Sequence, residues 1–178
     1  MNYFLSKEES NFYEDEGYLV RENQFSINEV NALRHALERA VNKAQERASG
    51  GKVYFLDKKK FVDVDYMTLQ YEPQPEDNIL KVIEPAHFLD KELYSLTQDM
   101  RITDPVRSIL EEDEISLWTD KLNLKRPGRG SGFGWHQDSP YWVHDSNNVD
   151  LLPNVYLSLD NADENNGCFR VIRASHKE

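Results

Sequence analysis

The sequence predicts an α+β fold with a mainly β core, in which helices come first and strands last. Three observations support this prediction. A capped amphipathic helix pattern lies in the first third, segments rich in β-branched and aromatic residues follow it, and the last third alternates polar and apolar residues between turns. With 178 residues, of which 39% are hydrophobic and 11% aromatic, the chain has enough apolar material to bury the core of one domain.

Two helices are expected near the N-terminus. The first covers residues 7–16 and ends at Gly17, and a short strand is expected at 18–20. The second begins at a capping box, in which Ser26 and Glu29 satisfy each other's backbone N–H groups. This second helix is amphipathic and ends at the next pair of glycines, and its apolar residues recur every three or four positions: Val30, Leu33, Leu37 and Val41.

The middle of the chain predicts strands followed by two short helices. Strands are expected within residues 53–71 and at 79–84, because both stretches are rich in β-branched and aromatic or aliphatic residues. One helix is capped near Asp90. The other starts at Thr103, which places Pro105 at the first helical position that proline favours.

The last third predicts strands at 115–125, 154–159 and 168–172, with a loop at 127–134. Alternation places polar side chains on one face of each of the first two strands. This pattern fits a sheet with one face in water, and it also fits a barrel whose polar faces line a ligand cavity. The polar residues are Thr119, Lys121, Asn123 and Lys125 on the first strand, and Asn154, Tyr156 and Ser158 on the second.

His136 and Asp138 form the strongest candidate for chemistry. Residues two apart on an extended strand point to the same side, so an imidazole nitrogen and a carboxylate oxygen could bind one metal ion. The pair makes up two thirds of the 2-His-1-carboxylate triad that leaves open positions on Fe(II). A His-x-Asp sequence also arises by chance, and a surface histidine beside an aspartate is the alternative interpretation.

Charge and composition exclude several classes of function. The formal charge of −11, from 21 basic and 32 acidic residues, argues against nucleic-acid binding, which needs a concentrated basic surface. The single cysteine, Cys168, excludes an intrachain disulfide and a Cys-rich zinc site. No apolar run approaches the ~20 residues of a membrane span. We expect a soluble, cytoplasmic protein that acts on a small molecule, with its oligomeric state left open.

Six motifs follow one another along the chain, in residues 12–20, 83–87, 120–128, 132–138, 160–168 and 175–177. In this order they resemble the phytanoyl-CoA dioxygenase (PhyH) family of Fe(II)- and 2-oxoglutarate-dependent oxygenases. The resemblance implies a double-stranded β-helix, a cupin-like jelly roll with flanking N-terminal helices. It also implies one domain over 1–178, in which 1–112 give helical and strand support and 113–178 form the first part of the core.

The resemblance assigns roles to individual residues. It implies that His136 and Asp138 bind the iron and that Trp142 lies near the substrate. The residues that it implies contact 2-oxoglutarate are Lys81, Lys121, Asn123, Gln137 and Tyr156. Some of these roles have a plainer alternative. Lys81 could be a surface lysine on an edge strand, Tyr156 a core tyrosine, and Trp142 an aromatic residue that packs at the barrel mouth.

The implied activity is hydroxylation of an unactivated C–H bond in a small molecule or an acyl-CoA-type substrate, using Fe(II), 2-oxoglutarate and O2. The alternatives are a truncated or non-catalytic jelly-roll binding protein and a cupin-like metalloenzyme that does not use 2-oxoglutarate. In the family, the second histidine ligand and the arginine that binds 2-oxoglutarate follow the Ser-His-Lys motif, which here ends at Lys177. We therefore expect a truncated form, or the N-terminal two thirds of a longer oxygenase, without the C-terminal strands.

Overall fold

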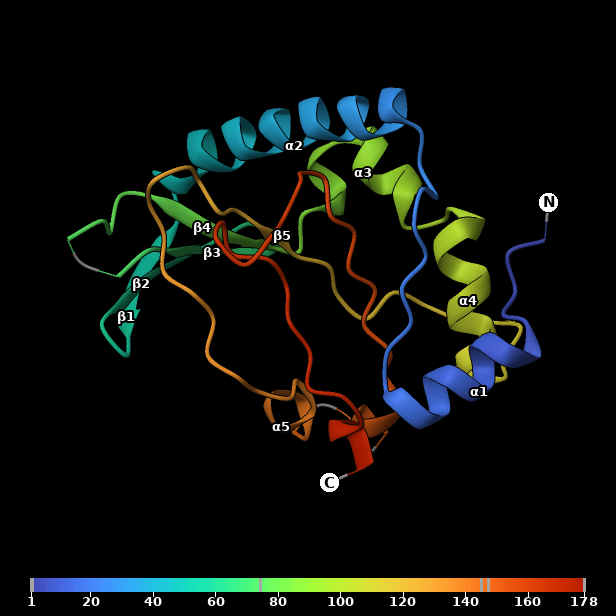
Figure 1. Cartoon of the computed structure of the whole chain (residues 1–178). Helices are drawn as coiled ribbons and strands as arrows, with labels where there is room; N and C mark the ends of the chain where they lie inside the picture. Colours follow the sequence, from blue (N-terminus) through green and yellow to red (C-terminus); the bar gives the residue numbers. More distant parts are fainter. Residues whose placement is uncertain (1, 74, 145, 147, 178) are drawn as a thin grey trace.

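A single antiparallel sheet and a layer of helices make up the ordered framework of the protein. The computed structural model describes residues 2–73, 75–144, 146 and 148–177, so the two end residues of the predicted domain, Met1 and Glu178, lie outside the described residues. The longest of the described helices, Ile27–Ala48 (α2), runs across one face of the sheet (Figure 1). The predicted α+β arrangement, with flanking helices at the N-terminus, is confirmed.

Helix α1 covers Lys7–Glu16, as predicted. Ser6 and Glu9 form a capping box at its start, and Gly17 ends it with a φ of 80°, a conformation that glycine adopts without steric cost. The strand predicted at 18–20 is wrong. Arg21, which follows this segment, donates to the carboxylate of Glu9 and to the carbonyl oxygens of residues 3 and 4, and so holds the segment against α1, away from the sheet.

Helix α2 covers Ile27–Ala48 and begins at the predicted capping box. The Ser26 hydroxyl accepts from the Glu29 N–H at 3.3 Å, and the Glu29 carboxylate accepts from the Ser26 N–H at 2.7 Å. Three alanines on its inner face bring the helix close to the sheet, because they have no bulk beyond Cβ. The buried residues of α2 are Leu33, Ala36, Ala40, Val41 and Ala44.

The sheet has the order β1-β2-β3-β4-β5, with every neighbouring pair antiparallel. Leu69 on β3 and Ile83 on β4 are its largest fully buried side chains, and burying each contributes about 1.5–3 kcal/mol. The strands predicted within 53–71 and at 79–84 are confirmed. The strands are Lys52–Leu56 (β1), Lys59–Val64 (β2), Met67–Tyr71 (β3), Leu80–Glu84 (β4) and Leu122–Asn123 (β5).

Two short helices connect β4 to the last third of the chain, after a 3₁₀ turn at His87–Leu89. Helix α3, Lys91–Leu96, is capped by Asp90 as predicted, and Arg39 of α2 donates to Asp90 Oδ2 at 2.7 Å. Helix α4, Met100–Leu110, begins earlier than predicted, because the side chain of Asp99 already caps it. Pro105 therefore lies inside the helix, where it cannot donate a backbone hydrogen bond.

The last third of the chain departs most from prediction. Of the expected strand at 115–125, only Leu122–Asn123 pairs with the sheet, and no strand forms at 154–159 or 168–172. A strand needs a neighbour for its backbone hydrogen bonds, and β4 is the neighbour of β5 in this sheet. The residues that the structure describes therefore form one open sheet and not a jelly roll.

Polar contacts hold this last third onto the framework. Arg126 donates to both carboxylate oxygens of Glu38 on α2, at 2.6 and 3.0 Å. Arg173 contacts the buried Glu16 at the end of α1. Among the described residues, no helix has both the length and the apolar character needed to cross a membrane.

The start of α2 predicts a sensitivity to acid. Hydrogen bonds from Ser26 and Arg101 lower the pKa of Glu29 from 4.5 to about 2. The contribution of ionised Glu29 to stability is complete above about pH 4.5 and is lost as the pH falls through about 2. We expect Glu29→Gln to reduce the loss of unfolding free energy between about pH 5 and pH 2, measured by urea denaturation. An unchanged loss, equal to that of the exposed control Glu46→Gln, would contradict this.

Candidate metal centre

The side chains of His136 and Asp138 meet. His136 Nε2 lies 3.2 Å from Asp138 Oδ1, and both side chains are partly exposed. Two donor atoms bound side by side on one small divalent ion lie roughly 3 Å apart, so this separation suits joint ligation. The pairing agrees with the expected meeting of the two side chains.

The local backbone that produces this pair is not the predicted strand. Residues 133–137 form a loop, and Asp138 has helical dihedral angles, φ −79° and ψ −31°, at the start of the short helix α5, Ser139–Trp142. Proline near the start of α5 suits a position whose backbone N–H has no helical partner. The turn from loop into helix brings the two side chains together, where we had expected the alternation of a strand to do so.

Two further contacts orient the pair. His136 Nδ1 lies 2.7 Å from the Gly134 carbonyl oxygen, which can only accept, so Nδ1 is the donor in this contact and Nε2 is the ring nitrogen that faces Asp138. Asn154 Nδ2 donates to Asp138 Oδ2 at 3.1 Å, and the other oxygen of that carboxylate is the one nearest His136. Contacts of this kind around metal ligands fix their orientation. The donor set therefore fits an Fe(II) site on these two ligands.

A third ligand is not found among the described residues, which contain no group of three His, Cys, Asp or Glu side chains that could hold a metal ion. His176 lies elsewhere, with Nε2 donating to the Glu14 carbonyl at 3.0 Å. Its ring packs against Gly17, where a Cβ atom would lie 2.3 Å from His176 Nδ1. His87 contacts Asp120 at 2.6 Å.

Lys121 and Trp142, which the resemblance assigned to co-substrate and substrate, lie near each other. The Lys121 ammonium lies 5.7 Å from the centre of the Trp142 ring, and Trp118 lies 6.5 Å from Trp142. Lys121 also contacts Glu84 Oε2 at 3.4 Å, so this cation is paired. Asn123 is exposed on β5, opposite Val82 of β4.

Gln137 and Tyr156 make contacts within the loop-rich part of the chain. Gln137 Nε2 donates to the Ser175 carbonyl at 2.9 Å, which ties the metal motif to the C-terminal turn beside α5 (Figure 1). Tyr156 is 53% exposed and stacks on Phe169, with ring centres 4.9 Å apart. The alternative of a core tyrosine is therefore wrong for this structure.

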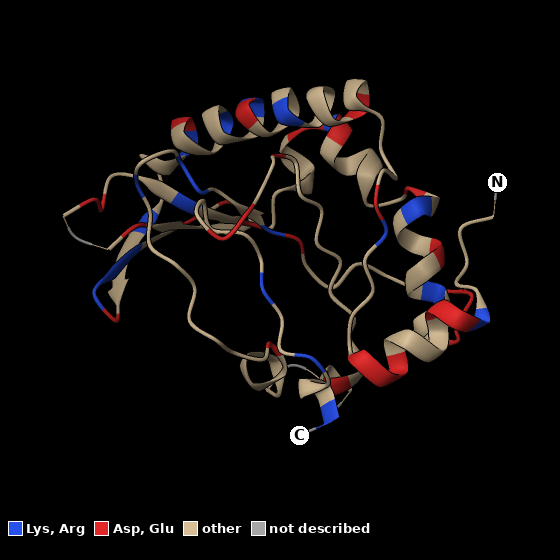
Figure 2. Cartoon of the chain, in the orientation of Figure 1, with Lys and Arg blue, Asp and Glu red and all other residues tan. Residues whose placement is uncertain are grey.

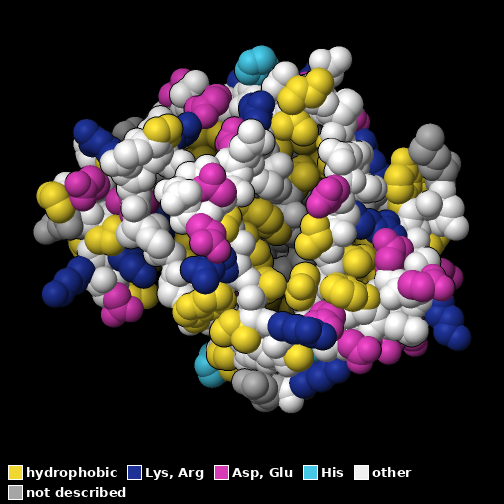
Figure 3. Space-filling model, in the orientation of Figure 1, with side chains coloured by type: hydrophobic (Ala, Val, Ile, Leu, Met, Phe, Trp, Pro, Cys, Tyr) yellow, Lys and Arg dark blue, Asp and Glu magenta, His cyan; other side chains and the backbone are white. Residues whose placement is uncertain are grey.

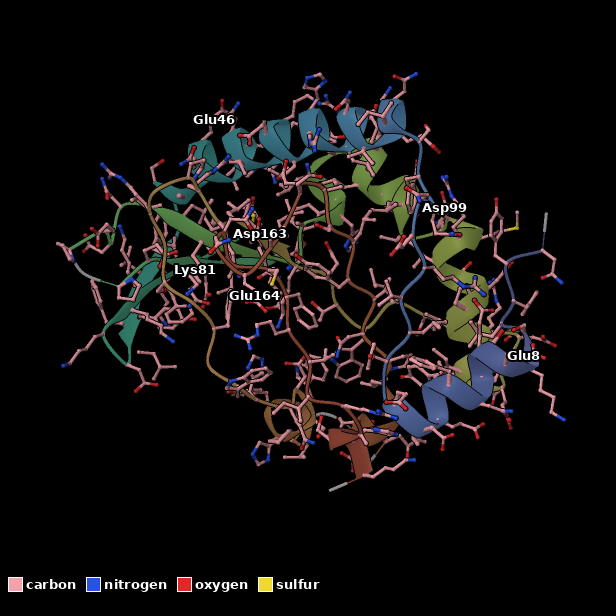
Figure 4. All side chains as sticks on the ribbon, in the orientation of Figure 1. Glu8, Glu46, Lys81, Asp99, Asp163 and Glu164 are labelled. Atoms are coloured by element: carbon pink, nitrogen blue, oxygen red, sulfur yellow. The ribbon has the colours of Figure 1, made fainter. Side chains whose placement is uncertain are left out.

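Lys81 is buried, with 3% of its surface exposed, and it lies on an interior strand. The alternative of a surface lysine on an edge strand is wrong. Its Nζ donates to Ser131 Oγ at 2.5 Å and lies 4.3 Å from the centre of the Phe133 ring. Figure 4 shows Lys81 at the sheet and Glu46 on the outer side of α2.

Two residues of this region had no role in the sequence prediction. Asn154 contacts the candidate metal ligand, and its only signal in the sequence was a place on the polar face of a predicted strand. Glu72 is a buried acid that contacts Ser131, and its signal was its place directly after the apolar pattern of β3. The sequence position of Asn154 or of Glu72 does not indicate which distant residue it contacts.

Apolar side chains remain exposed around the loop-rich part of the chain. Figure 3 shows a hollow near the centre of this face, bordered by hydrophobic side chains. Exposed apolar surface of this extent is typical of a surface that meets a ligand or another segment. The exposed large hydrophobic residues of the last third are Leu117, Trp118, Phe133, Trp135, Tyr141, Val143, Leu151, Val155, Tyr156, Phe169, Val171 and Ile172.

Acidic residues gather on α1, whereas α2 and the sheet carry charges of both signs (Figure 2). The C-terminal turn complements the acids of α1, because Lys177 Nζ lies 3.4 Å from Asp15 Oδ1 and Arg173 contacts Glu16. These pairs hold the end of the described chain beside α1. Gln137 of the metal motif donates to the Ser175 carbonyl in the same C-terminal segment, so the motif is tied to this segment as well.

Comparisons with known proteins place these features in a family. The family model described as "Phytanoyl-CoA dioxygenase (PhyH)" matches residues 13–178. A probable alpha-ketoglutarate-dependent hypophosphite dioxygenase from Stutzerimonas stutzeri is 29% identical over 170 residues, which cover 96% of this chain and 53% of that protein. An ectoine dioxygenase from Streptomyces avermitilis is 30% identical over 172 residues, which cover 93% of this chain and 50% of that protein. The chain thus spans about half the length of these curated relatives.

Asn154 provides a test of the candidate centre. We expect Asn154→Ala to weaken Fe(II) binding roughly 10- to 100-fold, because a carboxylate that loses its hydrogen-bond donor is held less firmly. Anaerobic titration with Fe(II) measures the change. The matched control is Asn42→Ala, at an exposed position on α2. Equal affinity in both variants would show that Asn154 does not orient Asp138.

Proposed function

The chain belongs to the phytanoyl-CoA dioxygenase family, and from this membership we propose that it forms part of an Fe(II)- and 2-oxoglutarate-dependent dioxygenase. The proposed reaction is hydroxylation of an unactivated C–H bond. One atom of O2 enters the hydroxyl group, and the other enters the succinate that is formed, together with CO2, from 2-oxoglutarate. The balanced reaction converts R–H, 2-oxoglutarate and O2 into R–OH, succinate and CO2.

The single observation that carries this proposal is the separation of 3.2 Å between His136 Nε2 and Asp138 Oδ1. We propose these two side chains as iron ligands, and bound Fe(II) would supply the site for oxidative chemistry with O2. The chain's own contribution is orientation. The Gly134 carbonyl holds the proton on His136 Nδ1, and Asn154 holds one oxygen of Asp138, so the facing atoms Nε2 and Oδ1 stay directed toward one point.

The co-substrate is a dianion, so its binding requires cationic and polar side chains. Lys121 is the most accessible lysine of the proposed set, with 36% of its side chain exposed beside Trp142. We propose that it exchanges its contact with Glu84 for a carboxylate of 2-oxoglutarate. Trp142, on the same side as Lys121, would then border the substrate. The other co-substrate residues that we propose are Lys81, Asn123, Gln137 and Tyr156.

We further propose that the active enzyme is a jelly roll completed by strands that are not among the described residues. These strands would supply the third iron ligand and an arginine for the far carboxylate of 2-oxoglutarate. Three observations support this: the two-ligand centre, the exposed apolar side chains of residues 117–172, and the length of the relatives, which is about twice the span that matches. Pairing with added strands would also give residues 115–125 and 154–159 the neighbours that strands require.

The names of the relatives support a small polar substrate. They include hypophosphite and ectoine dioxygenases, and a 2-aminoethylphosphonate dioxygenase from an uncultured bacterium that is 32% identical over 71 residues. We therefore propose a small molecule as substrate in preference to an acyl-CoA thioester.

A second candidate function is a non-catalytic binding protein on the same framework. The observation that favours it is the absence of a third metal-binding side chain among the described residues. Two protein ligands hold Fe(II) less firmly than three, so such a chain could bind a small molecule without turnover.

Succinate release tests the proposal. We expect the complete protein that contains this chain, supplied with Fe(II), 2-oxoglutarate and O2, to release succinate. We expect His136→Ala in that protein to lower both iron binding and succinate release at least 100-fold, because the site then loses one of its ligands. The control is His35→Ala, at an exposed position on α2. Iron content that does not change in His136→Ala would disprove the ligand assignment, and binding of 2-oxoglutarate without succinate release would favour the non-catalytic protein.

A further inference from the structure

A buried ion pair lies beneath the loop that leads to the metal motif. Glu72 and Lys81 are each only 3% exposed, and Lys81 Nζ lies 3.9 Å from Glu72 Oε2. Removing two charges from water is costly unless hydrogen bonds satisfy them. The apolar core between α2 and the sheet does not require this pair, so its place in the structure calls for another explanation.

The sheet directs Lys81 toward the loop. Gln70 pairs with Val82 and Tyr71 pairs with Leu80, so Lys81 is the extra residue of a β-bulge. A bulge redirects a side chain and is a common feature next to functional sites. The Lys81 ammonium donates to Ser131 Oγ at 2.5 Å and to the Gly132 carbonyl at 3.3 Å. The bulge thus directs the buried Lys81 ammonium from the sheet toward the loop.

Glu72 holds the same loop from the other side. Its Oε2 accepts from the Ser131 N–H at 3.0 Å and from the Ser131 hydroxyl at 2.7 Å. Gly130, one residue earlier, has a φ of 114°, and a Cβ atom there would lie 3.2 Å from Glu72 Oε1. The loop therefore needs glycine at this position to approach the carboxylate. We call Glu72, Lys81 and Ser131 the buried anchor.

The loop needs an anchor because of its composition. Residues 127–134, the glycine loop, contain glycine at every second position from 128 to 134. Glycine loses more conformational freedom on folding than any other residue, so a chain of this kind is not fixed by its own backbone preferences. Gly134, three residues after Ser131, provides the carbonyl that accepts from His136 Nδ1.

Electrostatics agrees with this geometry. Burial lowers the pKa of Lys81, and the charge of Glu72 acts in the opposite direction, favouring the ammonium form. A neutral amine would keep fewer donors for Ser131 and Gly132. The carboxylate thus contributes to the loop both directly, through Ser131, and through the charge of Lys81.

We propose that Glu72 is a positioning residue whose carboxylate, through Ser131 and Lys81, fixes the glycine loop on the sheet and thereby sets the place of the Gly134 carbonyl that orients His136. This inference rests on the proposed function, because it assigns a purpose to the orientation of a metal ligand. Glu72 itself has no part in binding the metal.

Hydrogen exchange on the metal-free chain tests the anchor. We expect Glu72→Ala to raise the exchange rate of amides in residues 128–137 at least tenfold, while amides in α2 keep their rates. Ser131→Ala, which leaves the ion pair in place, should raise the same rates about threefold or more. The control Glu46→Ala, at an exposed position on α2, should change none of them. Unchanged exchange in the loop of Glu72→Ala would overturn the proposal.

Metal affinity separates positioning from a general loss of stability. We expect Fe(II) affinity to fall at least tenfold in Glu72→Ala, and to stay within threefold of the unchanged chain in Val62→Ala, which loses core packing away from the loop. Glu72→Gln keeps an acceptor for Ser131 and leaves Lys81 in place, so its Fe(II) affinity should fall less than that of Glu72→Ala. Equal losses in Val62→Ala and Glu72→Ala, or equal losses in Glu72→Gln and Glu72→Ala, would overturn the proposal.

Failure of the proposed function gives a different result. If the unchanged chain binds no Fe(II), the metal assignment fails, whereas the exchange rates of residues 128–137 still decide whether Glu72 fixes the loop. If Glu72→Ala does not fold, Ser131→Ala replaces it in both measurements. Wild-type exchange in the loop of Ser131→Ala would then overturn the proposal.

Discussion

The contact between α2 and the central strands is the constraint on which the other parts of this structure depend. Alanines on the inner face of α2 let the helix approach the sheet, and Leu69 and Ile83 fill the space between them without exposed surface. A sheet of this size is stable only when one face is covered. Two later parts of the chain are attached to this pair of layers by ion pairs: α3 through Arg39 and Asp90, and the last third of the chain through Glu38 and Arg126.

The last third of the chain is attached partly by apolar packing and partly by polar contacts. Among the described residues, this region adds only the two-residue strand β5 to the sheet. Leu124 belongs to the core, and charged or polar contacts such as Glu16 with Arg173 and Glu72 with Ser131 hold the loops. Such contacts are directional, so they place a loop accurately, but each adds little stability unless it is buried. The candidate metal pair is therefore held in position by a few contacts, and it lies where the chain has the fewest regular elements to support it.

The candidate centre combines two scales of organisation. Over short sequence distances, Gly134 orients His136 across two residues, and a helix start gives Asp138 its direction. Over long distances, Asn154 holds Asp138, and Glu72 reaches across 59 residues to Ser131. A metal site needs both, because its ligands must be oriented as well as present. Family membership agrees with His136 and Asp138 as candidate iron ligands, and the hydrogen bonds described above show how this chain orients them.

The sequence by itself determined the elements whose signals are local. The capping box of Ser26 and Glu29 and the strands within 53–71 follow from residues a few positions apart. The spacing of His136 and Asp138 also predicted that they meet, but a loop and a helix start bring them together in place of the predicted strand. Tertiary structure decided the rest. The alternation of polar and apolar residues at 115–125 and 154–159 is typical of strands, but a strand forms only where a neighbouring strand pairs with its backbone hydrogen-bonding groups. The burial of Lys81 and the roles of Glu72 and Asn154 depend on partners 16 to 59 residues away, and no local pattern encodes a contact of that range.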